Sequence, residues 1–291
     1  MENEQQNTNV QSGSLKGSQS STTDPADTNV KTAIAPEPET DLLLNAKDLC
    51  KSFGGIRAVD RAAIQVARGS ITGLIGPNGA GKTTLFNLLS SFIYPDAGEI
   101  CFDGMPIQTL SPYRIAQAGL VRTFQVARVL SRLSVLENML LGAQNQTGEN
   151  IVRALFRSGQ VRVEERHNRE RAMSILESVG LAAKAHDYAG ALSGGQRKLL
   201  ELARALMPQP RLILLDEPAA GVNPTLIGQI CEHIVEWNRE GISFLVIEHN
   251  MDVIMSLCDR IWVLAEGRNL ANGSPAEIQR NPKVLTAYLG E

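Results

Sequence analysis

Features that are missing from this chain limit what it can be. No uninterrupted apolar run among its 291 residues approaches the roughly 18–20 residues that cross a bilayer, so we expect no membrane span. The first residues, MENEQQNTNV, lack the cationic and apolar stretches of a secretory signal, and we expect a cytosolic product. The formal net charge is −3, without the basic surplus of proteins that coat nucleic acids, so we expect no nucleic-acid partner.

Cysteine is also scarce. The four cysteines lie far apart and form no CxxC pair, which argues against a disulfide framework or a zinc site; they are Cys50, Cys101, Cys231 and Cys258. We expect reduced thiols, most of them in the core. The 43% of hydrophobic and 20% of charged residues are, by contrast, enough for a full core, and the length fits one large domain or two coupled ones.

Composition divides the chain near residue 40. Residues 1–40 are rich in Ser, Thr, Asn, Gln, Asp and Pro and have almost no periodic apolar residues. Such a segment cannot bury enough surface to offset the entropy lost on ordering. We therefore predict a disordered N-terminal tail over 1–40 and an ordered domain over 41–291.

Strand and helix patterns alternate through the rest of the chain. Short runs typical of strands occur at 41–53, 62–70, 71–75, 97–107, 211–216, 242–249 and 260–267. Helical patterns dominate between about 126 and 190, where Gly180 is expected to end one helix, and a C-terminal extension covers about 268–291. This alternation predicts an α/β fold with a mainly parallel sheet and an inserted α-helical subdomain.

A glycine-rich loop lies between the apolar run 71–75 and a helical stretch. It fits the pattern GxxxxGK[ST] and consists of Gly76, Pro77, Asn78, Gly79, Ala80, Gly81, Lys82, Thr83 and Thr84. Glycines let several N–H groups point at phosphate oxygens, and the helix that follows adds its positive end. Lys82 is expected to lie between the β- and γ-phosphates and Thr83 to ligate Mg²⁺. The strand–loop–helix context favours this interpretation over a glycine-rich turn without a ligand.

Two adjacent acids end the apolar run in RLILLDEP. Asp216 ends a predicted buried strand, close to where a metal on the phosphate loop would lie. An Asp at a strand end is commonly just a turn or cap, but the Glu217 that follows it is distinctive. We predict that Glu217 polarises a water that attacks the γ-phosphate. Together with the glycine-rich loop, the pair predicts an ATPase.

A second candidate anion site opens a helix further along the chain. Ser193, Gly194, Gly195 and Gln196 follow Leu192 and precede RKLLELARALM, whose leucines have core spacing. Exposed amides and a hydroxyl at the positive end of a helix can bind an anion. For these residues alone, an ordinary helix cap is the simpler interpretation.

The motifs GPNGAGKTT, LSGGQ and LLDEP occur in this order, together with Gln125 and His249. In this the chain resembles the ATP-binding subunits of ABC transporters over about residues 41–291. The resemblance implies a P-loop NTPase core of mainly parallel sheet, with an antiparallel β subdomain and an inserted α-helical subdomain. It also implies ATP and Mg²⁺ as the bound nucleotide and metal.

Single residues receive roles from the same resemblance. Gln125 in VRTFQ corresponds to the Gln that reaches Mg²⁺, and His249 in IEHN to the histidine that contacts the γ-phosphate. Phe53 corresponds to the aromatic residue that stacks on adenine, although a Phe in the core is an equally fair interpretation. The chain departs from the family at Asn223, where an Asp is usual, and this weakens any inference about signalling through that loop.

The chain has one phosphate loop and one LSGGQ helix. In the family these face each other across a head-to-tail dimer, so one copy cannot close its own site. The resemblance therefore implies a second ATP-binding subunit, in a homo- or heterodimer, and two transmembrane permease subunits. It also implies that this chain lies at the cytoplasmic face of the inner membrane as a peripheral protein.

Three stretches resemble a narrower group: VRTFQVARVLSRLSVLENMLLGA, DEPAAGVNP and NPKVLTAYLGE. They are similar to the ATPases of bacterial branched-chain or neutral amino-acid importers, which work with a periplasmic solute-binding protein. Urea importers and lipopolysaccharide exporters look similar, and a soluble ABC ATPase acting on ribosomes or DNA is a further alternative. A P-loop kinase or GTPase is disfavoured by LSGGQ and by the missing base-reading motif of GTPases.

Overall fold

The computed structural model describes residues 41–123, 129–144 and 158–289. The predicted tail over 1–40 and the candidate metal residue Gln125 lie outside these ranges, as does the start of the predicted helical insert. Within the described ranges, no helix is both long enough and apolar enough to span a membrane.

A six-stranded sheet forms the centre of the described fold, in the order β10–β9–β3–β8–β7–β6. Its strands are β3 (Ile71–Ile75), β6 (Leu120–Arg122), β7 (Leu212–Asp216), β8 (Ser243–Ile247), β9 (Arg260–Ala265) and β10 (Arg268–Gly273). All pairs are parallel except β10–β9. Every residue of β3, β7 and β8 is buried, which explains why these strands appear in the sequence as continuous apolar runs.

An antiparallel sheet lies beside the central one, in the order β2–β1–β4–β5. Its strands are β1 (Leu42–Phe53), β2 (Ile56–Ala67), β4 (Ala97–Phe102) and β5 (Met105–Pro106). β4 and β5 are joined by a turn at Asp103 and Gly104, whose φ angles are 50° and 74°. The side chain of Asn269 on β10 bonds both the N–H and the carbonyl of Ala63, and so ties the two sheets together.

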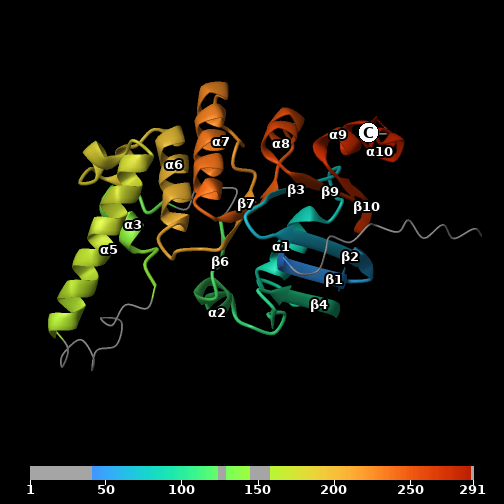
Figure 1. Cartoon of the computed structure of the whole chain (residues 1–291), viewed down its shortest axis with the longest axis horizontal. Coiled ribbons are helices and arrows are strands. Elements are labelled where there is room, and N and C mark those ends of the chain that lie inside the picture. The colour runs from blue at the N-terminus through green and yellow to red at the C-terminus, as the bar shows by residue number, and fades with distance from the viewer. Residues whose placement is uncertain (1–40, 124–128, 145–157, 290–291) are drawn as a thin grey trace, which may run out of the picture. The chain divides into compact units, whose positions relative to one another are not determined.

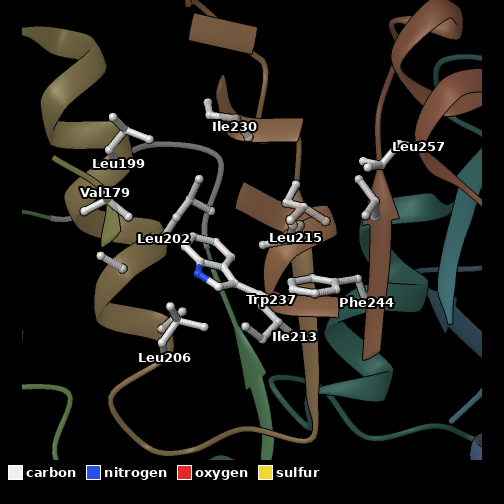
Figure 2. Close-up of a cluster of buried hydrophobic side chains, with 14 of the residues drawn as sticks. Val179, Leu199, Leu202, Leu206, Ile213, Leu215, Ile230, Trp237, Phe244 and Leu257 are labelled. Carbon is white, nitrogen blue, oxygen red and sulfur yellow. The ribbon is translucent and has the colours of Figure 1, made fainter. Parts of the chain in front are cut away.

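Helices cover the central sheet. They are α1 (Lys82–Leu89), α2 (Pro112–Gln117), α7 (Pro224–Arg239), α8 (Met251–Leu257), α9 (Pro275–Gln279) and α10 (Pro282–Leu289). Figure 2 shows how Trp237 of α7 packs among Leu202, Ile213 and Phe244. These side chains come from two helices and two strands, and each is at most 4% exposed. Burial of such large apolar groups is the main source of the stability of this layer.

The helical part is built from α3 (Val135–Leu140), α5 (Ser158–Ser178) and α6 (Gly194–Ala205), which lie together in Figure 1. Arg171 of α5 donates to the carbonyls of Leu206 and Met207 just beyond α6, at 2.8 and 3.3 Å, and so caps that helix end. After α5, Gly180 has a φ of 69°, the left-handed conformation in which helices commonly end.

The α/β class, the mainly parallel sheet and the antiparallel subdomain are as predicted. Neither β6 nor α2 was predicted from the sequence, and β2 begins at Ile56 instead of the predicted residue 62. The expectation of mostly buried cysteines is wrong within the described residues, because Cys258 alone is buried and the other three are partly exposed.

Candidate functional site

The glycine-rich loop joins β3 to α1, as its pattern requires. A Cβ at Gly76 would lie 2.0 Å from the carbonyl oxygen of Leu264, and one at Gly81 would lie 2.4 Å from that of Ala58. Gly81 also caps α1 with a φ of 96°. These close approaches to backbone exclude any side chain, so glycine is the residue that permits the loop to curl at the start of the helix.

Lys82 is the first residue of α1 and is 7% exposed. Its Nζ donates to the carbonyl oxygens of Gly76 at 2.6 Å and of Pro77 at 2.9 Å, both within the loop itself. Thr83 follows on the exposed side of the helix. The loop therefore surrounds a fixed positive charge at the positive end of a helix, an arrangement that suits phosphate.

A cavity of about 290 Å³ opens over this loop. Its wall consists of Ala58, residues 78–84, Glu217 and His249. The sheet order explains why Lys82, His249 and Glu217 lie around one cavity. They follow the carboxyl ends of β3, β8 and β7, which are adjacent and parallel. Ligands of α/β proteins bind at this edge of the sheet.

Glu217 and His249 are in direct contact. Nε2 of His249 lies 2.8 Å from Oε1 of Glu217, and the two side chains are 48% and 18% exposed, respectively. Glu217 has a φ of 50°, and its N–H donates to the carbonyl of Ile247 at the end of β8. A non-glycine residue in this conformation is uncommon and is held there by its surroundings, here by the neighbouring strand.

Asp216 does not line the cavity but lies beside it, paired with Arg122. The guanidinium donates to Oδ2 of Asp216 at 2.9 Å, and both side chains are at most 10% exposed. Arg122 also donates to Asn87 and Ser90, which belong to α1 and to the residue after it. Arg122 was not among the predicted site residues, although it belongs to the same VRTFQ stretch as Gln125.

Glu248 is a second missed residue. It directly precedes His249, is 4% exposed, and accepts hydrogen bonds from backbone amides, including those of Ala219 and His249. Burial raises the pKa of this carboxyl, while the amides act in the opposite direction. The available signal was an acid at the end of a buried strand, the same signal that identified Asp216.

Phe53 lies at the end of β1, before the Gly54–Gly55 turn, and is 49% exposed. Core packing is therefore not its role. The Nζ of Lys51 lies 5.7 Å from the centroid of the ring. The structure does not place Phe53 in the wall of the cavity over the loop.

The LSGGQ residues begin α6 and form a capping box. The hydroxyl of Ser193 accepts from the N–H of Gln196 at 3.2 Å, and the Gln196 side chain accepts from the N–H of Ser193 at 3.0 Å. Ser193, Gly195 and Gln196 border a different cavity, of about 560 Å³, together with Asn223. Within the described residues, this cavity shares no wall residue with the one over the phosphate loop.

The residues present fit a nucleotide with a hard cation. The cradle of glycines leaves room for phosphate oxygens, Lys82 balances their charge, and Thr83 and Asp216 supply the oxygen donors that Mg²⁺ prefers. In the described part of the chain, no group of three His, Cys, Asp or Glu side chains forms a ready metal cluster. Oxygens of the nucleotide and water would have to complete the coordination, as is usual for Mg²⁺.

This loop, sheet edge and pair of strand-end acids define a P-loop nucleotide-binding protein. Residues 59–220 match the family described as "ABC transporter", and residues 268–291 match "Branched-chain amino acid ATP-binding cassette transporter". The chain belongs to the ABC transporter family and is one of its ATP-binding, ATP-hydrolysing members.

Individual relatives are similar over most of their length. A probable branched-chain amino acid transport ATP-binding protein, LivG, of Archaeoglobus fulgidus is 43% identical over 85% of this chain and 95% of its own. A high-affinity branched-chain amino acid transport ATP-binding protein, BraF, of Pseudomonas aeruginosa is 41% identical over 86% and 98%.

Solved structures agree with this assignment. The ADP conformation of an ATP-binding cassette of an ABC transporter superposes with a TM-score of 0.76, at 38% identity, over 87% of this chain and 100% of that one. A dimeric ATP-binding cassette in a post-hydrolysis state, with ADP and Pi, superposes with a TM-score of 0.65, at 25% identity, over 80% and 98%.

Proposed function

We propose that this protein is the ATP-hydrolysing subunit of an importer for branched-chain or other neutral amino acids. The proposal is supported by the match of residues 268–291 to the branched-chain group and by relatives at about 40% identity whose names state that transport. The single observation that carries the ATPase part is the cavity in which Lys82, Glu217 and His249 meet.

We assign the chemistry to residues of this cavity. Lys82 and the loop amides hold the phosphates, with their charge balanced by the start of α1. Glu217 accepts a proton from the attacking water, and His249, 2.8 Å from Glu217, orients that carboxylate and reaches the γ-phosphate. Phe53 is assigned to the adenine, for which its exposed ring is available.

Mg²⁺ is assigned to the hydroxyl of Thr83, the carboxylate of Asp216 and Gln125. When bound, it neutralises charge on the phosphates. Arg122 orients the carboxylate of Asp216 by donating a hydrogen bond to its Oδ2 atom. Ligating carboxylates are commonly oriented in this way by hydrogen-bond donors behind them.

The working unit in this proposal is a dimer. Among the residues that the structure describes, the LSGGQ residues Ser193, Gly195 and Gln196 line a cavity apart from that of the phosphate loop. A second ATP-binding subunit would bring its own LSGGQ residues to that loop. The dimer would lie at the cytoplasmic face of the inner membrane and would pass its closing and opening to two transmembrane permease subunits. A periplasmic solute-binding protein would act only indirectly.

Uptake in cells tests the importer assignment. Deletion of the gene should abolish accumulation of labelled leucine, isoleucine, valine or another neutral amino acid. Wild-type protein should restore uptake, and Glu217→Gln at equal abundance should not. If uptake of all neutral amino acids survives the deletion while urea uptake or lipopolysaccharide export fails, the assignment to amino acids is wrong.

A further inference from the structure

We propose that Glu248 is a positioning residue that holds the loop carrying Glu217 and the loop carrying His249 in one catalytic arrangement. The inference rests on the ATPase function proposed above and extends it to a residue with no assigned role. Glu248 is not among the residues that line the cavity over the phosphate loop. It therefore acts through its two neighbours.

The contacts of this carboxylate cross from one strand end to the next. Oε1 of Glu248 accepts from the N–H of Ala219 at 2.6 Å, in the turn that follows Glu217. Oε2 accepts from the N–H of His249 at 3.2 Å. One side chain thus joins the loop after β7 to the loop after β8.

The burial of Glu248 shows that these bonds matter. At 4% exposure, a carboxylate is costly unless its charge is met by donors. Here the donors are backbone amides, and no lysine or arginine is among its hydrogen-bond donors in the described structure. A carboxylate bound to amides fixes the path of the backbone, since each amide belongs to a particular residue of a loop.

The turn that Glu248 holds is strained. Glu217 has a φ of 50°, and the N–H of Ala220 closes the turn on the carbonyl of Glu217 at 3.1 Å. We call the hydrogen bonds of Glu248 to Ala219 and His249 the clamp. Without the bond to Ala219, this turn can relax toward ordinary backbone geometry and carry the Glu217 side chain away from His249. The phosphate loop is built from β3 and α1 and does not depend on Glu248.

The role of Glu248 affects kcat but not nucleotide affinity. Loss of the clamp should lower kcat, because Glu217 and His249 are misplaced, while nucleotide affinity and KM persist through Lys82 and its loop. A misplacement of catalytic groups by about 1 Å costs roughly 100-fold in rate. Glu248→Ala should therefore reduce kcat by about 100-fold.

Glu248→Gln provides a graded test. Its amide oxygen can still accept from Ala219, but its NH₂ group would then face the N–H donor of His249. We expect this variant to keep one side of the clamp and to lose roughly 10-fold in kcat. Asp252→Ala is the matched control, because Asp252 is an exposed carboxylate in the first turn of α8, beside the same loop.

The experiment measures ATP hydrolysis, affinity for a fluorescent ATP analogue and thermal unfolding of the full-length chain and the three variants. The inference holds if kcat falls in the order wild type, Glu248→Gln, Glu248→Ala, with KM and analogue affinity within about threefold of wild type. It is overturned if Glu248→Ala turns over like Asp252→Ala. It is equally overturned if affinity falls with kcat or Glu248→Gln unfolds. An inactive wild type would instead count against the ATPase function itself.

Discussion

Three carboxylates lie at neighbouring strand ends of this site, and each has its own kind of partner. Asp216 is paired with the guanidinium of Arg122, Glu217 with the imidazole of His249, and Glu248 with backbone amides. Crowded like charges oppose ionisation unless each is compensated. Separate donors let the three acids take different tasks: a metal ligand, a base for water, and a support for the loops.

The task of the base is the most direct to test. In Glu217→Gln the amide cannot accept the proton of the attacking water, so kcat should fall by roughly 10²–10⁴-fold while ATP is still bound. Hydrolysis under saturating ATP and analogue binding measure the two effects. Lys82→Ala is the counterpart, because it removes the buried ammonium inside the loop and should abolish nucleotide binding. Normal turnover by Glu217→Gln would remove this residue from its assigned role.

At the scale of elements, the sequence predicted the strands that carry the site and missed the contacts that support it. The runs at 71–75, 211–216 and 242–249 are apolar and end at glycine or acidic residues, so β3, β7 and β8 were recognisable. Their parallel pairing then places the loops that follow them at one edge.

The missed features depend on contacts between distant parts of the chain. Arg122 and Asp216 are 94 positions apart, and Ala219 and Glu248 are 29 apart. No local pattern marks such pairs. β6 covers only Leu120–Arg122 and α2 only Pro112–Gln117, too short for a periodic signal. Propensity and periodicity therefore predicted the main strands and helices but not the hydrogen bonds that join distant parts of the chain.

A local set of hydrogen bonds organises the start of α3. The side chain of Asn138, 0% exposed, accepts from the N–H of Leu130 at 2.9 Å and donates to the carbonyls of Leu130 and Ser134 at 3.0 and 2.9 Å. It folds the segment before α3 back onto the helix. The cap of Ser134 with Glu137 completes this helix start.

Asn138→Ala would remove the buried hydrogen bonds that the side chain makes to the backbone of Leu130 and Ser134. The free energy of unfolding should fall by roughly 1–3 kcal/mol. Arg132→Ala, an exposed change in the same segment, should alter it by less than about 0.5 kcal/mol. Urea denaturation of the full-length chain measures both. A midpoint for Asn138→Ala equal to that of Arg132→Ala would show that Asn138 does not hold the segment.

At the scale of the whole molecule, the described structure carries two half-sites. One is the phosphate loop with Glu217 and His249, and the other is the start of α6 with Asn223. The two cavities share no wall residue in the described structure, so the phosphate loop and the LSGGQ residues of one chain do not form a single site. A head-to-tail pair of chains would join each loop to the other chain's helix and build two composite sites.

Gly194 gives a way to damage one half-site without disturbing the fold. A Cβ at this position has nothing within 4 Å, whereas one at Gly195 would lie 2.4 Å from Leu226. Gly194→Glu should therefore fold normally yet oppose the phosphates of the other chain's nucleotide with a negative charge. Alone, it should be as inactive in hydrolysis as Lys82→Ala.

Mixing the two inactive variants then tests the composite site. In a mixed dimer, the intact loop of the Gly194→Glu chain faces the intact helix of the Lys82→Ala chain, and one site works. Because half of the dimers in an equal mixture are mixed and each has one active site of two, about a quarter of wild-type hydrolysis should return. The measurement is ATP hydrolysis after the variants are mixed and exchanged, with each variant alone as control. A mixture as inactive as its components would contradict sites shared between two copies of this chain.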